Sequence, residues 1–586
     1  MSDDAAPAAL VWAPDGDRAA LVADGLSYAG RGADVLPRVA ALEAERHPRW
    51  VWWSAGDDAR PLVREGIGVQ RCWDLAEAHR LLRGGWAADP GMVWATVCRL
   101  PPDRVPRSTG DLFDFADDRS APGAPSAPGG WSAPEGLGDL LRPDGYLRPE
   151  AVDRTWLSTG ERLLAWGRAA LTAAAAQHLL LAEVSNRAVS TAHSESAAAL
   201  LCVELEESGL PLDRATAEQL ITASAGPRPT SREHARAIAE DRDRAVLQRL
   251  GHRADQKADL RNPAHVRELL ASAGIVVKDT RAWRLEPFRD SSPLVEALLQ
   301  WRKAERIAST YGYAWLDAHV GTDGRLRGEW TACDGAAGRM TASNGLHNLP
   351  RPLRPAVAAA PGHVLVRADL GQIEPRVLAA VSGDPAFIRD THADDLYAPV
   401  AARLGVERPR AKVAVLAAMY GQTSGAAGEA LKGLQRAYPT AVGYLEAAYA
   451  EGVAGRALRT YGGRRVPTSG PGPGSVAQQD GAEGVAPEAL AGRGRFARNA
   501  VVQGAAAELF KAWAATVRLR LTGTGAETVL CLHDELLVHA PVAAAQDTAM
   551  VLESSLTDAA RRWTGSAQAR FVADTRVVHR WSEAKD

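Results

Sequence analysis

The stretch Val364–Asp384 reads VLVRADLGQIEPRVLAAVSGD. It predicts an apolar strand that ends at Asp369, a turn through Gly371, and a helix that carries Glu374 and Arg376. A strand that ends on one carboxylate, followed by a helix that carries a second, can hold a divalent metal ion against a substrate. Taken alone, however, an Asp at a strand end is as readily a helix cap or a solvated turn.

A second stretch, Glu527–Ala540, reads ETVLCLHDELLVHA. Two apolar runs flank the segment His533–Glu535, and this pattern predicts a β-hairpin with acids at its turn. A two-metal site needs carboxylates from two strands that meet at one place, because its ions lie roughly 3.5–4 Å apart. The strand end at Asp369 and the turn at Asp534 are the two places where the sequence offers such acids.

A third stretch, RPRAKVAVLAAMYG over Arg408–Gly421, predicts a helix with a functional face. Four side chains spaced four residues apart share this face: Arg408, Lys412, Leu416 and Tyr420. Pro409 has no amide hydrogen and fits only a first helical turn, so the helix begins near Arg408. Lys412 is informative because the chain has only seven lysines. An ordinary surface helix with a basic first turn is the alternative.

The three stretches resemble motifs A, B and C of the family A DNA polymerases, in the family's order and with similar spacings. A single motif would be weak evidence, but three in order leave chance a poor explanation. The resemblance implies a multidomain protein of the α/β and α+β classes. It would be a right-hand polymerase of palm, fingers and thumb, preceded by an RNase H-like exonuclease-type α/β domain.

The length of 586 residues suggests roughly three or four domains. The resemblance and the composition together predict an exonuclease-like α/β domain at 1–100, a Pro/Gly-rich linker or loop at 101–150, the helical remainder of that domain at 151–193, a helical thumb at 194–335, palm with motif A at 336–400, fingers with motif B at 401–466, a disordered insertion at 467–494, and palm with motif C at 495–586.

The resemblance also implies a reaction. A primer 3′-hydroxyl would attack the α-phosphate of a dNTP and release pyrophosphate, with two Mg²⁺ ions held by Asp369 and Asp534 and with Mn²⁺ able to substitute. Glu535 would support the metal site, and Lys412 would neutralise phosphates and protonate the leaving pyrophosphate. Glu374, against Tyr420, would crowd a ribose 2′-hydroxyl.

The remaining substrate contacts follow from the same resemblance. The implied dNTP-binding residues are Arg408, Lys412, Leu416, Tyr420, Glu374, Gln372 and His533. The implied DNA-binding residues are Arg339, His347, Asn348, Arg495, Asn499 and Gln503. Two positions depart from the family pattern, because Leu416 stands where an aromatic ring is usual and His347 where Gln is usual.

The exonuclease-like part lacks most of the carboxylates that proofreading needs. Such a site holds two metals with four acids, and of these we find only Asp58. The first strand has no D-x-E, since Asp15-Gly16-Asp17 fits a hairpin turn, and the late helix Arg162–Gln177 contains no acid. We therefore predict a vestigial domain without 3′–5′ exonuclease activity. A working exonuclease with relocated ligands is the alternative.

Composition is that of an ordinary globular protein, with 46% hydrophobic and 24% charged residues and a net charge of −3. Five scattered cysteines without a C-x-x-C pair argue against a disulfide framework or a zinc site. We see no signal peptide or membrane span and expect a monomeric, cytoplasmic, nucleoid-associated bacterial protein of DNA replication or repair. Because the chain begins directly with the exonuclease-like part, we expect no 5′-nuclease activity.

The expected partners are primer–template DNA and dNTPs. A different class of function also fits the pattern: a catalytically weak protein of polymerase fold that binds primer–template junctions. The presence of Asp369, Asp534, Lys412 and Tyr420 together argues for the enzyme.

Overall fold

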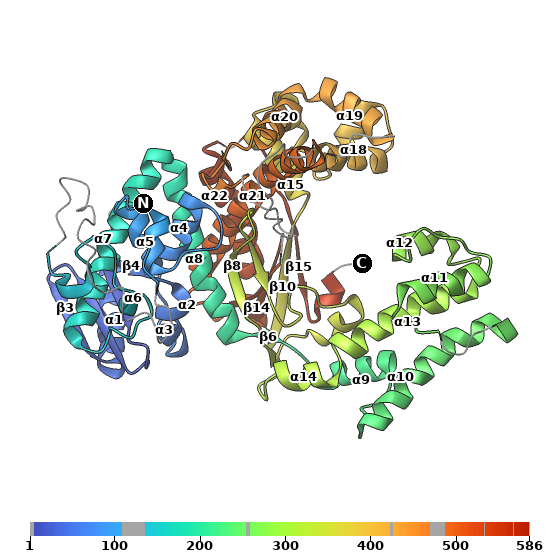
Figure 1. The fold of residues 1–586 in the computed structure, drawn as a ribbon, viewed down its shortest axis with the longest axis horizontal. Coiled ribbons are helices and arrows are strands. Elements are labelled where there is room, and N and C mark those ends of the chain that lie inside the picture. Colours follow the sequence, from blue (N-terminus) through green and yellow to red (C-terminus); the bar gives the residue numbers. More distant parts are fainter. Residues whose placement is uncertain are drawn as a thin grey trace. The chain divides into compact units, whose positions relative to one another are not determined.

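The computed structural model describes residues 5–107, 135–253, 258–421, 426–468, 487–532, 534–566 and 568–584. The chain divides into two compact units, whose elements are labelled in Figure 1. Unit 1 consists of Met1–Ser208, Glu329–Ala342 and Val366–Val577, and unit 2 of Gly209–Gly328, Ser343–Leu365 and Val578–Asp586. Among the described helices, none is both long enough and apolar enough to cross a membrane.

Unit 1 begins with a five-stranded mixed sheet in the order β3-β2-β1-β4-β5. Its strands are β1 (Pro7–Trp12), β2 (Arg18–Ala23), β3 (Leu26–Arg31), β4 (Arg49–Trp52) and β5 (Arg71–Asp74). The β1-β2-β3 meander is antiparallel, whereas β4 runs parallel to both β1 and β5. Gly16, at a φ of 72°, supplies the left-handed residue of the predicted hairpin turn. This part is α/β, as the sequence predicts.

Helices cover this sheet and close its core. They are α1 (Gly32–Arg46), α2 (Ala55–Asp58), α3 (Arg60–Arg64), α4 (Leu75–Arg83), α5 (Pro90–Val97), α6 (Pro149–Val152), α7 (Gly160–Val184) and α8 (Asn186–Ser208). Helix α7 lies against β1 and β2. Its Trp166 stacks on Trp53 with ring centroids 4.3 Å apart, inside a cluster of buried apolar side chains.

Several predicted domain boundaries differ from the structure. The end of the range 101–150 is not a linker, because Leu137, Leu140 and Leu147 are buried in the N-terminal core. Composition misled here, since Pro and Gly are frequent around a few well-packed leucines. The boundary at 193/194 falls inside α8, which is continuous from Asn186 to Ser208.

Helix α8 joins the N-terminal sheet to the rest of unit 1 through two adjacent residues. The Ser196 hydroxyl accepts a hydrogen bond from the Asp74 amide at the end of β5. Glu195 is fully buried and pairs with Arg464, at 2.6 Å, and with Lys511. Burial alone would raise the pKa of Glu195, but these two cations hold it below its ordinary value.

A second sheet in unit 1 has the order β13-β14-β10-β15. Its strands are β10 (His363–Leu370), β13 (Glu527–Leu532), β14 (Glu535–Pro541) and β15 (Ala573–Val578). β13 and β14 form the predicted antiparallel hairpin. Helices α21 (Pro487–Leu521) and α22 (Ala545–Thr564) pack together and contact this hairpin. A separate hairpin pairs β8 (Trp330–Asp334) with β9 (Arg339–Ala342).

The helices between Ile373 and Val453, which run from the predicted palm (336–400) into the predicted fingers (401–466), share one apolar cluster, which includes Phe387, Leu396, Tyr438 and Leu445. They are α15 (Ile373–Ser382), α16 (Pro385–Asp390), α17 (Tyr397–Leu404), α18 (Arg408–Tyr420), α19 (Ala426–Ala437) and α20 (Pro439–Val453). A small hairpin, β11 (Leu458–Arg459) with β12 (Arg465–Val466), follows. The predicted disordered insertion 467–494 lies outside the described residues from 469 to 486, but its end is wrong, because residues from Pro487 onward are helical in α21.

Unit 2 is a helical body, as predicted for the thumb. Its helices are α9 (Arg214–Ala225), α10 (Arg232–Leu247), α11 (Pro263–Ser272), α12 (Ala282–Leu285), α13 (Pro293–Thr310) and α14 (Tyr313–His319). The short strands β6 (Leu210–Pro211) and β7 (Arg325–Leu326) pair antiparallel. Trp301 anchors its core and donates its indole hydrogen to Asp243, 2.8 Å away.

Candidate functional site

The ends of two neighbouring strands bring the predicted metal ligands together. The Leu370 amide, at the end of β10, donates to the Asp534 carbonyl in the β13–β14 turn, 2.7 Å away. Both Asp369 and Asp534 are partly exposed. The turn after β10 places Gln372 at a φ of 57° before α15 begins. His533, predicted to bind dNTP, lies outside the described residues.

The sequence analysis missed Arg367, whose guanidinium lies among these acids. Its side chain is 1% exposed and pairs with Asp369. Its Nε and Nη2 lie 3.1 Å from the two carboxylate oxygens of Glu535, and its Nη1 lies 3.6 Å from Asp574. Arg367 and Asp369 share a face of β10 because side chains alternate along a strand. The two-residue spacing between Arg367 and Asp369 could therefore have indicated from the sequence that the two side chains are neighbours.

The donor set suits Mg²⁺ bound together with a substrate. Within the described residues, no group of three or more His, Cys, Asp or Glu side chains is arranged to hold a metal ion. Mg²⁺ commonly takes one or two protein carboxylates, several waters and substrate phosphates, rather than an all-protein cage. Asp369 and Asp534, both partly exposed and carried by bonded strand ends, meet that requirement.

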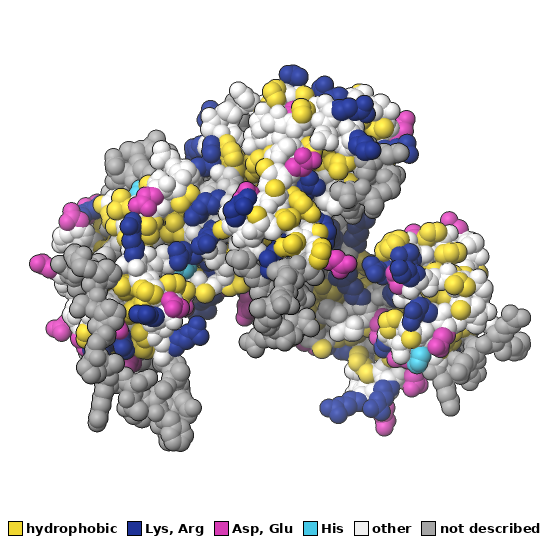
Figure 2. Space-filling view, turned by 45° about the horizontal axis from the view of Figure 1, so that its top comes forward, with side chains coloured by type: hydrophobic (Ala, Val, Ile, Leu, Met, Phe, Trp, Pro, Cys, Tyr) yellow, Lys and Arg dark blue, Asp and Glu magenta, His cyan; other side chains and the backbone are white. Residues whose placement is uncertain are grey.

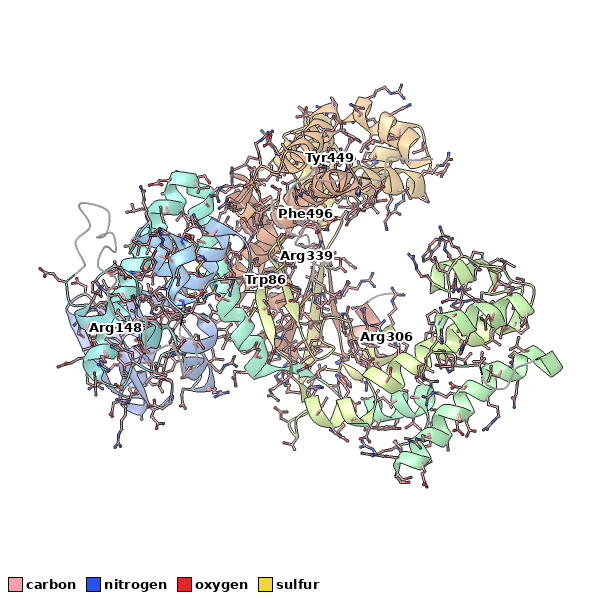
Figure 3. All side chains as sticks on the ribbon, in the orientation of Figure 1. Trp86, Arg148, Arg306, Arg339, Tyr449 and Phe496 are labelled. Carbon is pink, nitrogen blue, oxygen red and sulfur yellow. The ribbon has the colours of Figure 1, made fainter. Side chains whose placement is uncertain are left out.

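A polar cluster joins motif A to the end of motif B. The Tyr420 hydroxyl donates to Glu374, 2.9 Å away, and Glu374 also lies 3.6 Å from Arg339, which is labelled in Figure 3. Gln503 of α21 is a further side-chain partner of Tyr420. Partial burial and the Glu374 carboxylate raise the pKa of Tyr420, which keeps the phenol protonated. The cluster thus joins Glu374 and Tyr420, the two residues predicted to crowd a ribose 2′-hydroxyl, by a direct hydrogen bond.

The two predicted phosphate-binding cations differ in their surroundings. Arg408 pairs with Asp395 at 2.5 Å, and this contact holds the pKa of Asp395 below its usual range. Lys412 is exposed and makes no ion pair with any described residue. Gln372 uses both ends of its amide, donating to Asp395 at 2.7 Å and accepting from the Leu396 amide at 2.8 Å. Asp395 was not predicted from the sequence, yet its carboxylate binds both Gln372 and Arg408, two of the predicted dNTP-binding residues.

Helix α18 has the predicted bounds, Arg408–Tyr420, with Pro409 in its first turn and Gly421 in the left-handed conformation at its end. Leu416 is partly buried and packs against the apolar cluster of the surrounding helices. On this face of α18 Lys412 and Tyr420 are therefore exposed, and Leu416 between them is less exposed to solvent.

Helix α21 carries the three predicted DNA contacts on one outward face. Arg495 is exposed, whereas Asn499 and Gln503 are partly exposed. A Cβ on Gly421 would lie 3.1 Å from the Arg495 side chain, so the ends of α18 and this face of α21 are close neighbours. Lys and Arg side chains (dark blue) are scattered over the helical end of unit 1 at the top of Figure 2, among white and yellow surface.

His347 and Asn348 belong to unit 2. Asn348 is exposed, and its carbonyl accepts hydrogen bonds from the Tyr311 hydroxyl at 2.9 Å and from Arg306, labelled in Figure 3, at 3.2 Å. His347 is partly exposed. These contacts fix the backbone of the loop and leave the Asn348 side chain at the surface.

Asp58, the predicted remnant of an exonuclease site, is 1% exposed. Its carboxylate accepts hydrogen bonds from the amides of Trp12, at 3.3 Å, and Trp53, at 3.2 Å, and lies 3.6 Å from Arg154. Burial raises the pKa of Asp58 to about 7. Its contacts tie β1 to the end of β4, which is a structural task.

Comparison with known proteins identifies relatives of the C-terminal part. The DNA polymerase family A model matches residues 238–583, more than half of the chain. DNA polymerase I of Thermus caldophilus is 30% identical over 312 residues, which cover 48% of this chain and 36% of that protein. DNA polymerase I of Chloroflexus aurantiacus is 30% identical over 309 residues, covering 47% and 31%. The match thus spans about a third of the length of these curated relatives.

A solved structure shares the fold along the whole chain. It is described as the POL domain of Pol1 from M. smegmatis in complex with DNA primer-template and dNTP. The superposition covers 100% of this chain and 96% of the other chain, with a TM-score of 0.65 and 20% sequence identity. This likeness confirms the polymerase fold that the three motifs imply. The chain therefore belongs to the family A DNA polymerases.

Proposed function

We propose that this chain is a template-directed DNA polymerase that adds dNTPs to a primer 3′-hydroxyl by a two-metal mechanism. The observation that supports it most is the meeting of two strand ends, where the Leu370 amide bonds to the Asp534 carbonyl at 2.7 Å. That backbone bond joins the end of β10, which carries Asp369, to the β13–β14 turn, which carries Asp534. Two carboxylates so placed suit in-line phosphoryl transfer.

In the proposed reaction the primer 3′-hydroxyl attacks the α-phosphate of the dNTP, and pyrophosphate leaves. Asp369 and Asp534 would hold two Mg²⁺ ions, which supply activation of the hydroxyl and charge stabilisation at the leaving group when bound. Lys412 neutralises the phosphates and donates a proton to the leaving pyrophosphate. Arg408 assists it, and the Tyr420 ring stacks near the base.

The proposal also assigns contacts to the DNA. Arg339, His347 and Asn348 face the minor-groove side of the primer–template junction, where His347 can donate to acceptors shared by all base pairs. Arg495, Asn499 and Gln503 lie along the duplex from α21. We propose palm, fingers and thumb for the regions named above, and a cytoplasmic monomer as the working form.

Primer extension tests the proposal directly. We expect a labelled primer annealed to a longer DNA template to be extended to the template end with Mg²⁺ and four dNTPs, and to stay unextended when EDTA removes the metal. Binding of the same primer–template without extension would instead support the junction-binding alternative.

Proofreading is expected to be absent. A primer with a mismatched 3′ end, given Mg²⁺ or Mn²⁺ without dNTPs, should keep its length, because Asp58 is buried, is bonded to two backbone amides and is the one acid of the expected four that the sequence matches. Gel analysis of the primer over time measures this. Metal-dependent shortening that disappeared in Asp58→Ala would revive the exonuclease.

Sugar selection is expected to depend on Glu374 and not on Leu416. Glu374→Ala removes the partner of the Tyr420 hydroxyl, so incorporation of ribonucleotides relative to deoxynucleotides should rise by about tenfold or more. Leu416→Phe is the matched comparison. It should lower the KM for dNTPs through added contact with the sugar and leave ribonucleotide rejection unchanged. Single-nucleotide incorporation kinetics with dNTP and rNTP separate the two effects, and an unchanged dNTP KM in Leu416→Phe would contradict the placement of this residue.

A further inference from the structure

Arg367 is a buried cation placed inside a cluster of acids. With its side chain 1% exposed, it contacts Asp369 on its own strand, Glu535 on β14 and Asp574 on β15. These strands flank β10 on both sides in the sheet order β13-β14-β10-β15. The Arg367 guanidinium therefore links β10 to both of its neighbouring strands, two residues before Asp369 of motif A.

We propose that Arg367 has two effects on the metal site. In the metal-free protein it holds the carboxylates of Asp369 and Glu535 in place. It also makes the site bind divalent ions more weakly than it would with a neutral residue at position 367. The inference rests on the proposed function, because the ions belong to the proposed reaction. Arg367 is a positioning residue and touches no substrate.

Electrostatics give the direction of the effect. A carboxylate that is already paired with a guanidinium attracts a divalent ion less, and the guanidinium repels the ion itself. Arg367 is shielded from solvent, so water screens this repulsion poorly. Repulsion of a divalent ion a few ångströms away should weaken binding by about tenfold or more.

The same contacts explain how Asp369 can be released to a metal. Arg367 meets Glu535 through two nitrogens, each 3.1 Å from a carboxylate oxygen, and keeps Asp574 at 3.6 Å. When Asp369 turns to an ion, the guanidinium therefore stays paired, and no buried charge is left without a partner. Asp369 is 22% exposed and has room to turn, whereas Glu535 is 6% exposed and remains held.

Direct metal binding tests the proposal without relying on catalysis. The full chain, without DNA or nucleotide, is titrated with Mn²⁺, and the free ion is followed by electron paramagnetic resonance. Asp369→Asn identifies the site, because it should remove the tightest Mn²⁺. Arg367→Gln should then bind Mn²⁺ about tenfold more tightly than the wild type, and Arg367→Lys, which keeps the charge, should stay near the wild type.

Arg520→Gln is the matched control, since it also removes one arginine of unit 1 but one whose contacts are with Asp558, Ser554 and Ser555. It should leave Mn²⁺ affinity unchanged.

Thermal unfolding with and without Mn²⁺ is the second measurement. Arg367→Gln should melt at a lower temperature than the wild type without metal, because Asp369 and Glu535 then repel each other, and Mn²⁺ should raise its melting temperature by more.

The outcomes separate the two claims. Unchanged Mn²⁺ binding in Asp369→Asn would overturn the metal site of the proposed function and this inference with it. Two other results would overturn this inference alone, provided that Asp369→Asn has lost Mn²⁺ binding. One is Mn²⁺ binding by Arg367→Gln that is equal to or weaker than that of the wild type. The other is tighter binding than the wild type by Arg367→Lys. An Arg367→Gln protein that folds only with Mn²⁺ supports it. One that is unfolded in every condition overturns it, since Arg367 would then be a purely structural residue.

Discussion

Asp369→Ala and Asp534→Ala are each expected to lower the rate of primer extension by about a thousandfold or more. Both carboxylates would be needed to hold the metal ions, which would supply activation of the hydroxyl and stabilisation of the leaving group, so losing either one should remove both effects. Duplex binding should persist, because the phosphate-contacting cations lie on other elements. Single-turnover extension with saturating DNA measures the loss, and a DNA-binding titration accompanies it.

Asp558→Ala supplies the control for this pair. Asp558 is also an acid of unit 1, but it pairs with Arg520 and Arg561 on the surface of α21 and α22. Its replacement should leave extension near the wild-type rate. Near wild-type extension in either Asp369→Ala or Asp534→Ala would contradict the metal assignment.

Lys412→Ala is expected to lower kcat/KM for dNTP incorporation by about a hundredfold. Its ammonium is exposed and has no ion-pair partner among the described residues, so its full charge is available to the triphosphate and to the departing pyrophosphate. Arg408→Ala should cost less, about tenfold, because Arg408 must first leave Asp395. Steady-state single-nucleotide incorporation measures both.

Lys432→Ala is the matched control, because Lys432 is another exposed lysine on a neighbouring helix, α19. It should leave kcat/KM unchanged. A larger loss in Arg408→Ala than in Lys412→Ala would reverse the assigned roles.

Local chemistry made much of this fold predictable. Pro409 and Gly421 set the two ends of α18, because proline fits only a first turn and glycine tolerates the left-handed conformation. The apolar run before Asp369 predicted β10, and the acids between two apolar runs predicted the β13–β14 turn. The residues that form the Tyr420–Glu374 pair were selected because of the resemblance.

Contacts between distant segments were not predictable in this way. Strand alternation places Arg367 beside Asp369, but no local pattern says that Glu535 and Asp574 flank it on neighbouring strands. Asp395 lies in a turn without a motif, and its link to Gln372 and Arg408 depends on the packing of α15, α17 and α18. Leu137 and Leu147 were hidden by a composition rich in Pro and Gly.

The two neighbouring residues of α8 have a consequence for how this protein can change over generations. Ser196 is bonded to the N-terminal sheet, while Glu195 pairs with buried Arg464 and Lys511 of the C-terminal part of unit 1. Deleting the N-terminal part through α8 would strand two buried cations, and breaking one such pair typically costs about 3–5 kcal/mol. If the N-terminal part has no exonuclease activity, as we propose, it would still be retained as a scaffold, because Glu195 of α8 is the counterion of two buried cations in the C-terminal part.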